Sequence, residues 1–228
     1  MRFLVLPVGV AALFVIAGPV LVAAGDADVC AKGTGDEKIA ACTRSINSGT
    51  WKGPNLAWAY TNRGIAYRAK GEPDRAIADY DRAIWLNPKF ADAYNGRGSA
   101  YDDKGDRDRA IADYDQAILL NPNYADAYNN RGIAYRAKGE LGRAIADYDQ
   151  AIRLNPNFAM AFYNRGIAHY FQKDFDRAIA DYDQAIQFNA NDVHAYKNRG
   201  LAKRAKGDSA GSDGDMAMAK QLNQGAGN

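Results

Sequence analysis

The residues that could support catalysis or metal binding are few, and their spacing does not bring them together. The chain has two histidines, His169 and His194, and two cysteines. His169 takes a position that tyrosine holds 34 residues earlier, at Tyr135, which indicates packing. His194 has no neighbouring histidine or cysteine with which to share a metal. Neither HExxH, nor GxSxG, nor a Gly-rich phosphate loop occurs. The sequence therefore predicts a non-enzymatic protein without cofactor or metal.

Carboxylates are plentiful, but they recur with a fixed period. Two aspartates separated by one residue occur at Asp79/Asp81, Asp113/Asp115, Asp147/Asp149 and Asp181/Asp183. A catalytic carboxylate pair would occur once, so we expect these repeated surface pairs to be structural. An arginine recurs in phase with them, at Arg63, Arg97, Arg131, Arg165 and Arg199. The two series together predict a ladder of ion pairs, although phosphate binding by the arginines is an alternative. Exposed pairs of this kind would each be worth about 0–1 kcal/mol.

The elements that position these residues repeat every 34 positions. Gly64 recurs at Gly98, Gly132, Gly166 and Gly200. In one unit Tyr60, Gly64 and Tyr67 fall on one helical face. Gly71 then predicts a helix end, and Asn87-Pro88 ends a second helix because the residue before proline avoids the α region. Each unit is therefore expected to be a helix, a tight turn and a second helix.

These residues resemble the tetratricopeptide repeat (TPR) family, whose units carry aromatic, Gly, Tyr, Ala and Pro residues at set positions. The first unit supplies the following matches: Tyr60, Gly64, Tyr67, Ala76, Tyr80, Ala83 and Pro88. The arginine series is a departure, since the family usually has leucine there. The resemblance implies an all-α fold, a right-handed α-solenoid of helix-turn-helix units. It also implies a concave groove lined by the first helices, which binds protein segments.

The period divides the chain into segments. We expect TPR units at 56–90, 91–124, 125–158 and 159–192, a degenerate fifth unit that caps the array at 193–224, and a tail at 225–228. Residues 25–55 are predicted to form an N-terminal capping segment with a lone helix, because residues 39–46 echo residues 77–84. A basic start, an apolar run and the small residues Val22-Ala23-Ala24 predict a signal peptide at 1–24. A retained membrane anchor is the alternative.

The compartment follows from the leader and the cysteines. Export to the periplasm of a bacterium, or secretion, is expected. In an oxidising compartment Cys30 and Cys42, the only cysteines, are predicted to form a disulfide that ties an N-terminal strand to the capping helix. The formal net charge is +2, with acidic and basic residues interleaved in every unit. This balance argues against a nucleic-acid partner.

The groove residues are expected opposite the packed face of each first helix. Asparagine recurs in one slot, with Gly96 as the exception, and asparagine can pair with an extended peptide backbone or solvate the helix surface. The fourth unit places apolar and aromatic residues there instead, which favours a contact site. Packing of Tyr170 and Phe171 under the cap is the alternative. The predicted partner-binding residues are Asn62, Arg68, Asn130, Arg136, Met160, Tyr163, Asn164, Ile167, Tyr170, Phe171, His194, Lys197 and Asn198.

The function predicted from these features is a protein–protein interaction scaffold or adaptor that binds a peptide or protein segment in the groove. Two alternatives stay open: a self-associating structural protein, and an accessory component of an envelope complex that binds sugars or accompanies an enzyme. A membrane is a partner only if the leader is retained. The sequence does not define the oligomeric state or the identity of the partner.

Overall fold

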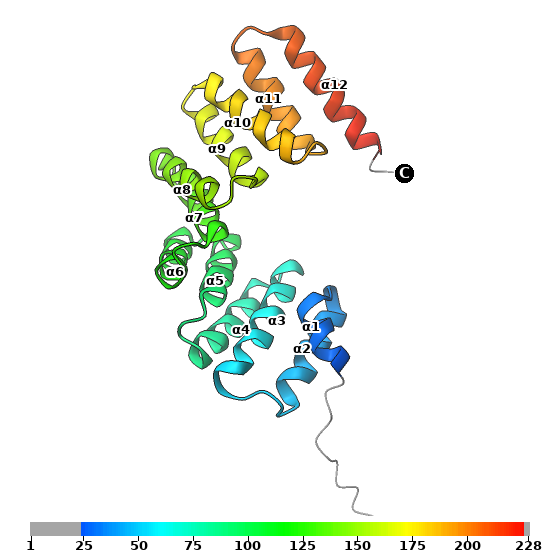
Figure 1. Ribbon diagram of the computed structural model, residues 1–228, viewed down its shortest axis with the longest axis vertical. Helices are drawn as coiled ribbons and strands as arrows, with labels where there is room; N and C mark the ends of the chain where they lie inside the picture. Colours follow the sequence, from blue (N-terminus) through cyan, green and yellow to red (C-terminus); the bar gives the residue numbers. More distant parts are fainter. Residues whose placement is uncertain (1–23, 226–228) are drawn as a thin grey trace, which may run out of the picture.

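The computed structural model describes residues 24–225. The predicted signal peptide, apart from Ala24, and residues 226–228 of the predicted tail lie outside this part. The described chain is all-α, as predicted, and forms a curved stack of antiparallel helix pairs with α1 and α12 at opposite ends (Figure 1). Its elements are α1 Ala24–Lys32, α2 Gly35–Asn47, η1 Gly53–Leu56, α3 Ala57–Ala69, α4 Pro73–Leu86, α5 Ala91–Asp103, α6 Arg107–Leu120, α7 Ala125–Ala137, α8 Leu141–Leu154, α9 Ala159–Phe171, α10 Phe175–Phe188, α11 Val193–Ala205 and α12 Ser209–Gly225.

The turn inside each unit requires a left-handed backbone. Glycine supplies it in four units, at Gly71, Gly105, Gly139 and Gly207. In the fourth unit Lys173 adopts the same conformation, with φ of 63°. A residue with a Cβ in this region costs about 1–2 kcal/mol. The turn between α9 and α10 is therefore more strained than its counterparts.

Close packing of glycine against tyrosine joins the two helices of a unit. A Cβ atom at Gly132 would lie 2.6 Å from Cε1 of Tyr148, which is closer than real Cβ contacts come. The corresponding tyrosines of all four full units are buried, and small alanines surround them: Tyr80, Tyr114, Tyr148 and Tyr182. The fixed spacing of the repeat thus places a large ring against a position without a side chain, which lets the backbones approach.

The predicted arginine–aspartate ladder is confirmed. Nε and Nη2 of Arg131 on α7 donate to both carboxylate oxygens of Asp147 on α8, at 2.8 and 2.6 Å. Its Nη1 donates to Asp115 on the preceding α6, at 2.5 Å. Arg97, Arg165 and Arg199 repeat this arrangement. Each of these arginines therefore joins three helices of two neighbouring units.

The expectation that both members of each aspartate pair lie on the surface is wrong. The first aspartate of each pair is buried; Asp147, for example, is 6% exposed. The carboxylate tolerates burial because a guanidinium binds it through two parallel hydrogen bonds. The second aspartate stays about half exposed, as Asp115 does with 52% of its side chain accessible.

The N-terminal segment contains a helix pair, so the prediction of a lone helix there, preceded by a strand, is wrong. Helix α1 packs against α2. The predicted disulfide is present and links these two helices, with the Cα atoms of Cys30 and Cys42 4.6 Å apart and both residues fully buried. Helix α1 has only nine residues and little amphipathic pattern. Helix α1 packs through Val29 and Cys30 in a small cluster with α2 and α3, and it lacks the periodic apolar face by which a helix is predicted from sequence.

The C-terminal segment retains a complete pair, α11 and α12, which ends the described stack. Asp215 on α12 takes the place of the buried aspartate and accepts hydrogen bonds from Arg199 at 2.5 and 3.0 Å. The ladder therefore continues into this unit although its glycines weaken the helix.

The first helices lie on the inner side of the curve. First helices of successive units, such as α3 and α5 or α7 and α9, contact one another more closely than the second helices do. The concave groove that the family resemblance implies is therefore lined by α3, α5, α7, α9 and α11. Within residues 24–225, none of the helices combines the length and apolar character needed to cross a bilayer.

Candidate functional site

Most of the asparagines predicted to bind a ligand instead link neighbouring units. Three of them donate their side-chain amide to the residue 35 positions earlier: Asn130 to Asn95 at 3.1 Å, Asn164 to Asn129 at 3.0 Å, and Asn198 to the hydroxyl of Tyr163 at 3.1 Å. Asn164 is only 5% exposed. These amides hold adjacent first helices together, so their N–H groups are engaged in the scaffold. Asn62 donates to the carbonyl of Trp58 in its own helix.

The second unit interrupts this amide ladder at Gly96. Its acceptor would be Thr61, whose side-chain hydroxyl is buried and has no hydrogen-bond partner. The hydroxyl of Tyr80 is also buried and unpartnered. The ring of Tyr80 lies against Gly96, where a Cβ atom would be 2.5 Å from Cε1. Two polar groups at the α3–α5 junction therefore lack partners among the residues that the structure describes.

A pocket of about 470 Å³ opens at this junction, and we call it the junction pocket. Thr61, Tyr80 and Gly96 line it together with two exposed aspartates, Asp92 and Asp126, from the first turns of α5 and α7. Neither aspartate forms an ion pair with a described residue. Phe90 and Tyr124 add aromatic walls. The lining of the junction pocket thus contains two carboxylates and the ion-paired Arg68, and the unpartnered hydroxyls of Thr61 and Tyr80 are buried in its wall.

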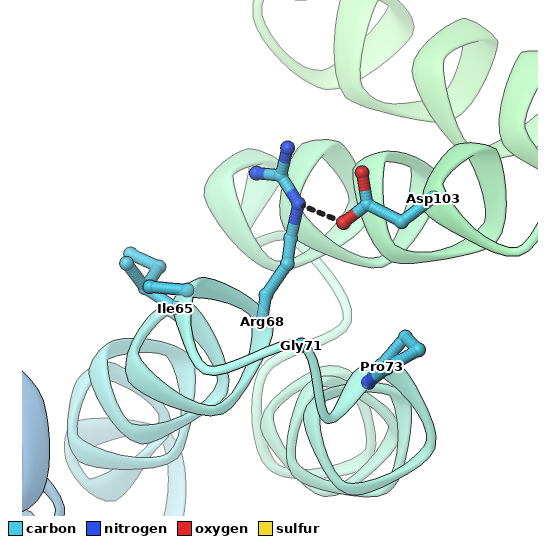
Figure 2. A pocket seen from close by; sticks show the side chains of 6 residues that line it. Ile65, Arg68, Gly71, Pro73 and Asp103 are labelled. Carbon is cyan, nitrogen blue, oxygen red and sulfur yellow. Dashed lines mark hydrogen bonds and ion pairs between the residues drawn. The ribbon is translucent and has the colours of Figure 1, made fainter.

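Arg68, predicted as a basic groove residue, is already neutralised. Its Nε donates to Asp103 of the next unit at 2.6 Å, as Figure 2 shows. The pair lines a shallow pocket of about 620 Å³ together with Ile65 and the turn at Gly71 and Pro73. Arg68 is therefore a link between α3 and α5 and supplies little positive charge to the groove.

Arg136 holds the equivalent position two units later, but the residue 35 positions after it is Phe171. No described carboxylate pairs with Arg136, and its Nε is buried without a hydrogen-bond partner. Arg136 lines a pocket of about 290 Å³, which we call the aromatic pocket; the other lining residues are Ile167, Tyr170, Phe171, Tyr182, Asn198 and Leu201. Five of the predicted partner-binding residues thus meet in one place.

The alternative that Tyr170 and Phe171 pack under the cap does not describe Phe171, which is 62% exposed. Leu201 beside it is 44% exposed. Tyr170 is held by edge contacts with Phe171 and Phe175, whose ring centroids lie 6.3 and 5.4 Å away. An apolar surface therefore faces the groove at this end.

Three more of the predicted partner-binding residues, Asn62, Arg68 and Asn130, line the junction pocket, and the remaining ones lie outside both pockets. Met160, His194 and Lys197 are exposed along the same helices. Tyr163 is half-buried, and its ring lies 6.0 Å from that of Tyr182. Sequence reasoning did not select Thr61, Tyr80 or Asp126 as site residues. The break at Gly96 in the asparagine series was the signal that could have found them.

His169 packs in the core, as predicted, and is 6% exposed. Burial lowers its pKa, although Asp181, with an oxygen 3.8 Å from Nε2, acts in the opposite direction. Burial also raises the pKa of Asp181. In the described part of the chain, no three His, Cys, Asp or Glu side chains are grouped as metal ligands.

Family models confirm the repeat. A tetratricopeptide repeat model matches residues 57–90 and 159–192, and a TPR repeat model matches residues 98–139 and 134–173. These matches extend over more than half of the sequence, and the chain belongs to the tetratricopeptide repeat family. No curated protein matches it.

Solved structures agree with this assignment. A crystal structure of MamA is 27% identical, with a TM-score of 0.64 over 72% of this chain and 96% of MamA. PilF of Pseudomonas aeruginosa superposes with a TM-score of 0.70 at 19% identity, over 75% and 78% of the two chains. YrrB, described as a TPR protein with an unusual peptide-binding site, is 21% identical, with a TM-score of 0.59 over 79% and 91%. The fold is one that typically serves as a scaffold for protein–protein interactions and is generally non-enzymatic.

Proposed function

We propose that this protein is a non-enzymatic adaptor or scaffold that binds an extended segment of a partner protein along its concave groove, with the aromatic pocket as the main anchor. The observation that carries the proposal is the combination of exposed Phe171 and Leu201 with Arg136 in one pocket, where Nε of Arg136 has no hydrogen-bond partner among the described residues. Exposed aromatic clusters mark contact surfaces, and buried aromatic or arginine anchors dominate binding energies.

The occupant that fits the aromatic pocket is an apolar side chain of a peptide. A volume of about 290 Å³ accommodates a leucine-, methionine- or phenylalanine-sized group. Arg136 can then donate to a backbone carbonyl or to a carboxylate of the same segment. The description of YrrB as having a peptide-binding site supports the same class of ligand.

Export to an oxidising compartment is part of the proposal. The buried disulfide between α1 and α2 supports it, because disulfides persist in such compartments. The predicted leader supports it as well. Mass spectrometry of the N-terminus after expression in a bacterial host should find Gly25 as the first residue; an intact Met1 in the membrane fraction would instead indicate a retained anchor.

A peptide selection tests the binding function. The immobilised protein is presented with a random peptide library, enriched peptides are synthesised, and their affinity is measured by fluorescence anisotropy. Phe171→Ala with Leu201→Ala should weaken binding by about tenfold or more. Leu119→Ala, a 72% exposed apolar residue on α6 that lines neither pocket, is the matched control and should leave affinity unchanged.

Failure to enrich any peptide over the bare support would reject peptide binding. Equal affinities of the double variant and the control would remove the aromatic pocket from the site. Light scattering of the same samples addresses self-association. A dimer that the double variant abolishes would favour the structural alternative.

A further inference from the structure

The junction pocket differs from every other unit junction in what it lacks. At the next three junctions an asparagine amide satisfies the acceptor 35 positions earlier. Here Gly96 has no side-chain amide, and within residues 24–225 the hydroxyls of Thr61 and Tyr80 have no hydrogen-bond partner although the residues are 4% and 0% exposed. A buried polar group without a partner is costly, so a ligand that pairs with these hydroxyls would recover that cost.

We propose that the junction pocket binds the cationic side chain of a lysine or arginine. The inference rests on the proposed function for the source of that side chain, which is the segment bound in the groove. The aromatic pocket would then bind an apolar residue of the segment, and the junction pocket would bind a basic residue of the same segment.

Charge selects a cation over an anion. Asp92 and Asp126 at the rim have no ion-pair partner within residues 24–225, so both carboxylates face the pocket uncompensated. Arg68 also lines the pocket, but its guanidinium is bound to Asp103. An anionic side chain would meet two carboxylates, and like charges repel.

Hydrogen bonding selects a cation over an apolar group. A methyl or phenyl group would fill part of the pocket and leave the hydroxyls of Thr61 and Tyr80 unpaired. A guanidinium has five N–H donors and an ammonium three. Either can donate to the hydroxyl oxygens while it faces a carboxylate, and Tyr124 or Phe90 can lie against a guanidinium plane.

A titration with a small probe tests the pocket without any peptide. N-acetyl-arginine amide is added to the ¹⁵N-labelled protein, and the amide signals of the protein are followed by ¹H–¹⁵N NMR. N-acetyl-citrulline amide serves as the neutral isostere, and Nα-acetyl-lysine amide tests whether an ammonium group binds as well. The arginine probe should give saturable shifts at the Gly96 amide and its neighbours in α3, α5 and α7. The citrulline probe should bind at least about fivefold more weakly.

Charge variants then locate the contact. The double variant Asp92→Asn with Asp126→Asn should bind the arginine probe about tenfold more weakly than the wild type. Asp36→Asn with Asp108→Asn changes the net charge equally at exposed positions outside the junction pocket, and should bind like the wild type. Thr61→Val removes only a buried, unpartnered hydroxyl. The urea midpoint of this variant should equal or exceed that of the wild type, and its affinity for the arginine probe should still be lower.

The outcomes separate this inference from the proposed function. Equal shifts with arginine and citrulline probes, or equal affinities of the two aspartate double variants, would overturn the cation site. Peptides selected without enrichment of lysine or arginine would overturn it while leaving peptide binding intact. Specific binding of the arginine probe with no peptide selected would support the pocket and reject the segment as its source.

Discussion

Replacing one arginine of the ladder should destabilise the array far more than replacing its exposed partner. We consider Arg131→Met, which keeps an unbranched apolar side chain but removes all three hydrogen bonds to Asp147 and Asp115. Asp147 would then be a buried carboxylate without a cation. Asp115 would be half exposed and open to water.

The magnitude follows from these burials. Removing one partner of a buried ion pair costs about 3–5 kcal/mol, because the other charge is left uncompensated. An exposed pair contributes about 0–1 kcal/mol. Arg131→Met should therefore cost about 3–5 kcal/mol, and Asp115→Asn less than about 1 kcal/mol. The double variant Arg131→Met with Asp147→Leu removes both buried charges and should lie within about 1–2 kcal/mol of the wild type.

The assay is urea unfolding at neutral pH, monitored by far-UV circular dichroism. The wild type, the two single variants and the double variant are compared with a common m value, the slope of the free energy of unfolding against urea concentration. If Arg131→Met costs no more than Asp115→Asn, the buried ion pair does not stabilise the array as expected. If the double variant is as unstable as Arg131→Met, the cost does not come from the buried carboxylate of Asp147 that has lost its cation.

Three further outcomes can be measured in the same way. His169→Tyr should flatten the pH dependence of stability. Burial lowers the pKa of His169 from 6.5, so the contribution of the neutral imidazole to stability is complete above pH 6.5 and is lost as the pH falls below that value. The tyrosine variant should lack this loss of stability at low pH. Lys173→Gly should raise the free energy of unfolding by about 1 kcal/mol, because φ of 63° is unstrained in glycine; an unchanged or lower value would show that the turn stores no strain. Reduction of Cys30–Cys42 should lower stability by about 2–3 kcal/mol and add about 2 Da, and an unchanged mass would mean that no disulfide forms.

The scaffold was predictable because it repeats. The spacing of Gly132 and Tyr148 recurs in every full unit, and an arginine that recurs in phase with two aspartates indicates ion pairing between them. Helix α1 was not predictable, since nine residues without an apolar stripe give no helical signal. The burial of Asp147 was also missed, because a sequence shows that charges can pair but not whether water reaches them.

The candidate site was only partly predictable, and the asparagines show why. On an isolated helix Asn164 falls opposite the packed face, so it is expected to meet solvent or a ligand. In the array the preceding first helix, α7, covers that face, and the amide donates to Asn129. The clustering of Ile167, Tyr170 and Phe171 could be predicted because they lie on one helix. Their contact with Arg136 depends on which residues of neighbouring units face one another, and this cannot be predicted from the sequence.

The pairing of residues across units explains where specificity can reside in such an array. Links between residues 35 positions apart join α5 to α7, α7 to α9 and α9 to α11 through amides, and α3 to α5 through Arg68 and Asp103. Two links are missing one member: Thr61 faces Gly96, and Arg136 faces Phe171. Each leaves a polar group unpaired, at a cost of about 1–3 kcal/mol. The repeated links elsewhere can offset that cost, because stability is summed over many similar interfaces. A ligand that pairs with the hydroxyl of Thr61 or with Arg136 recovers binding energy at these two places, so recognition is expected between units rather than within them.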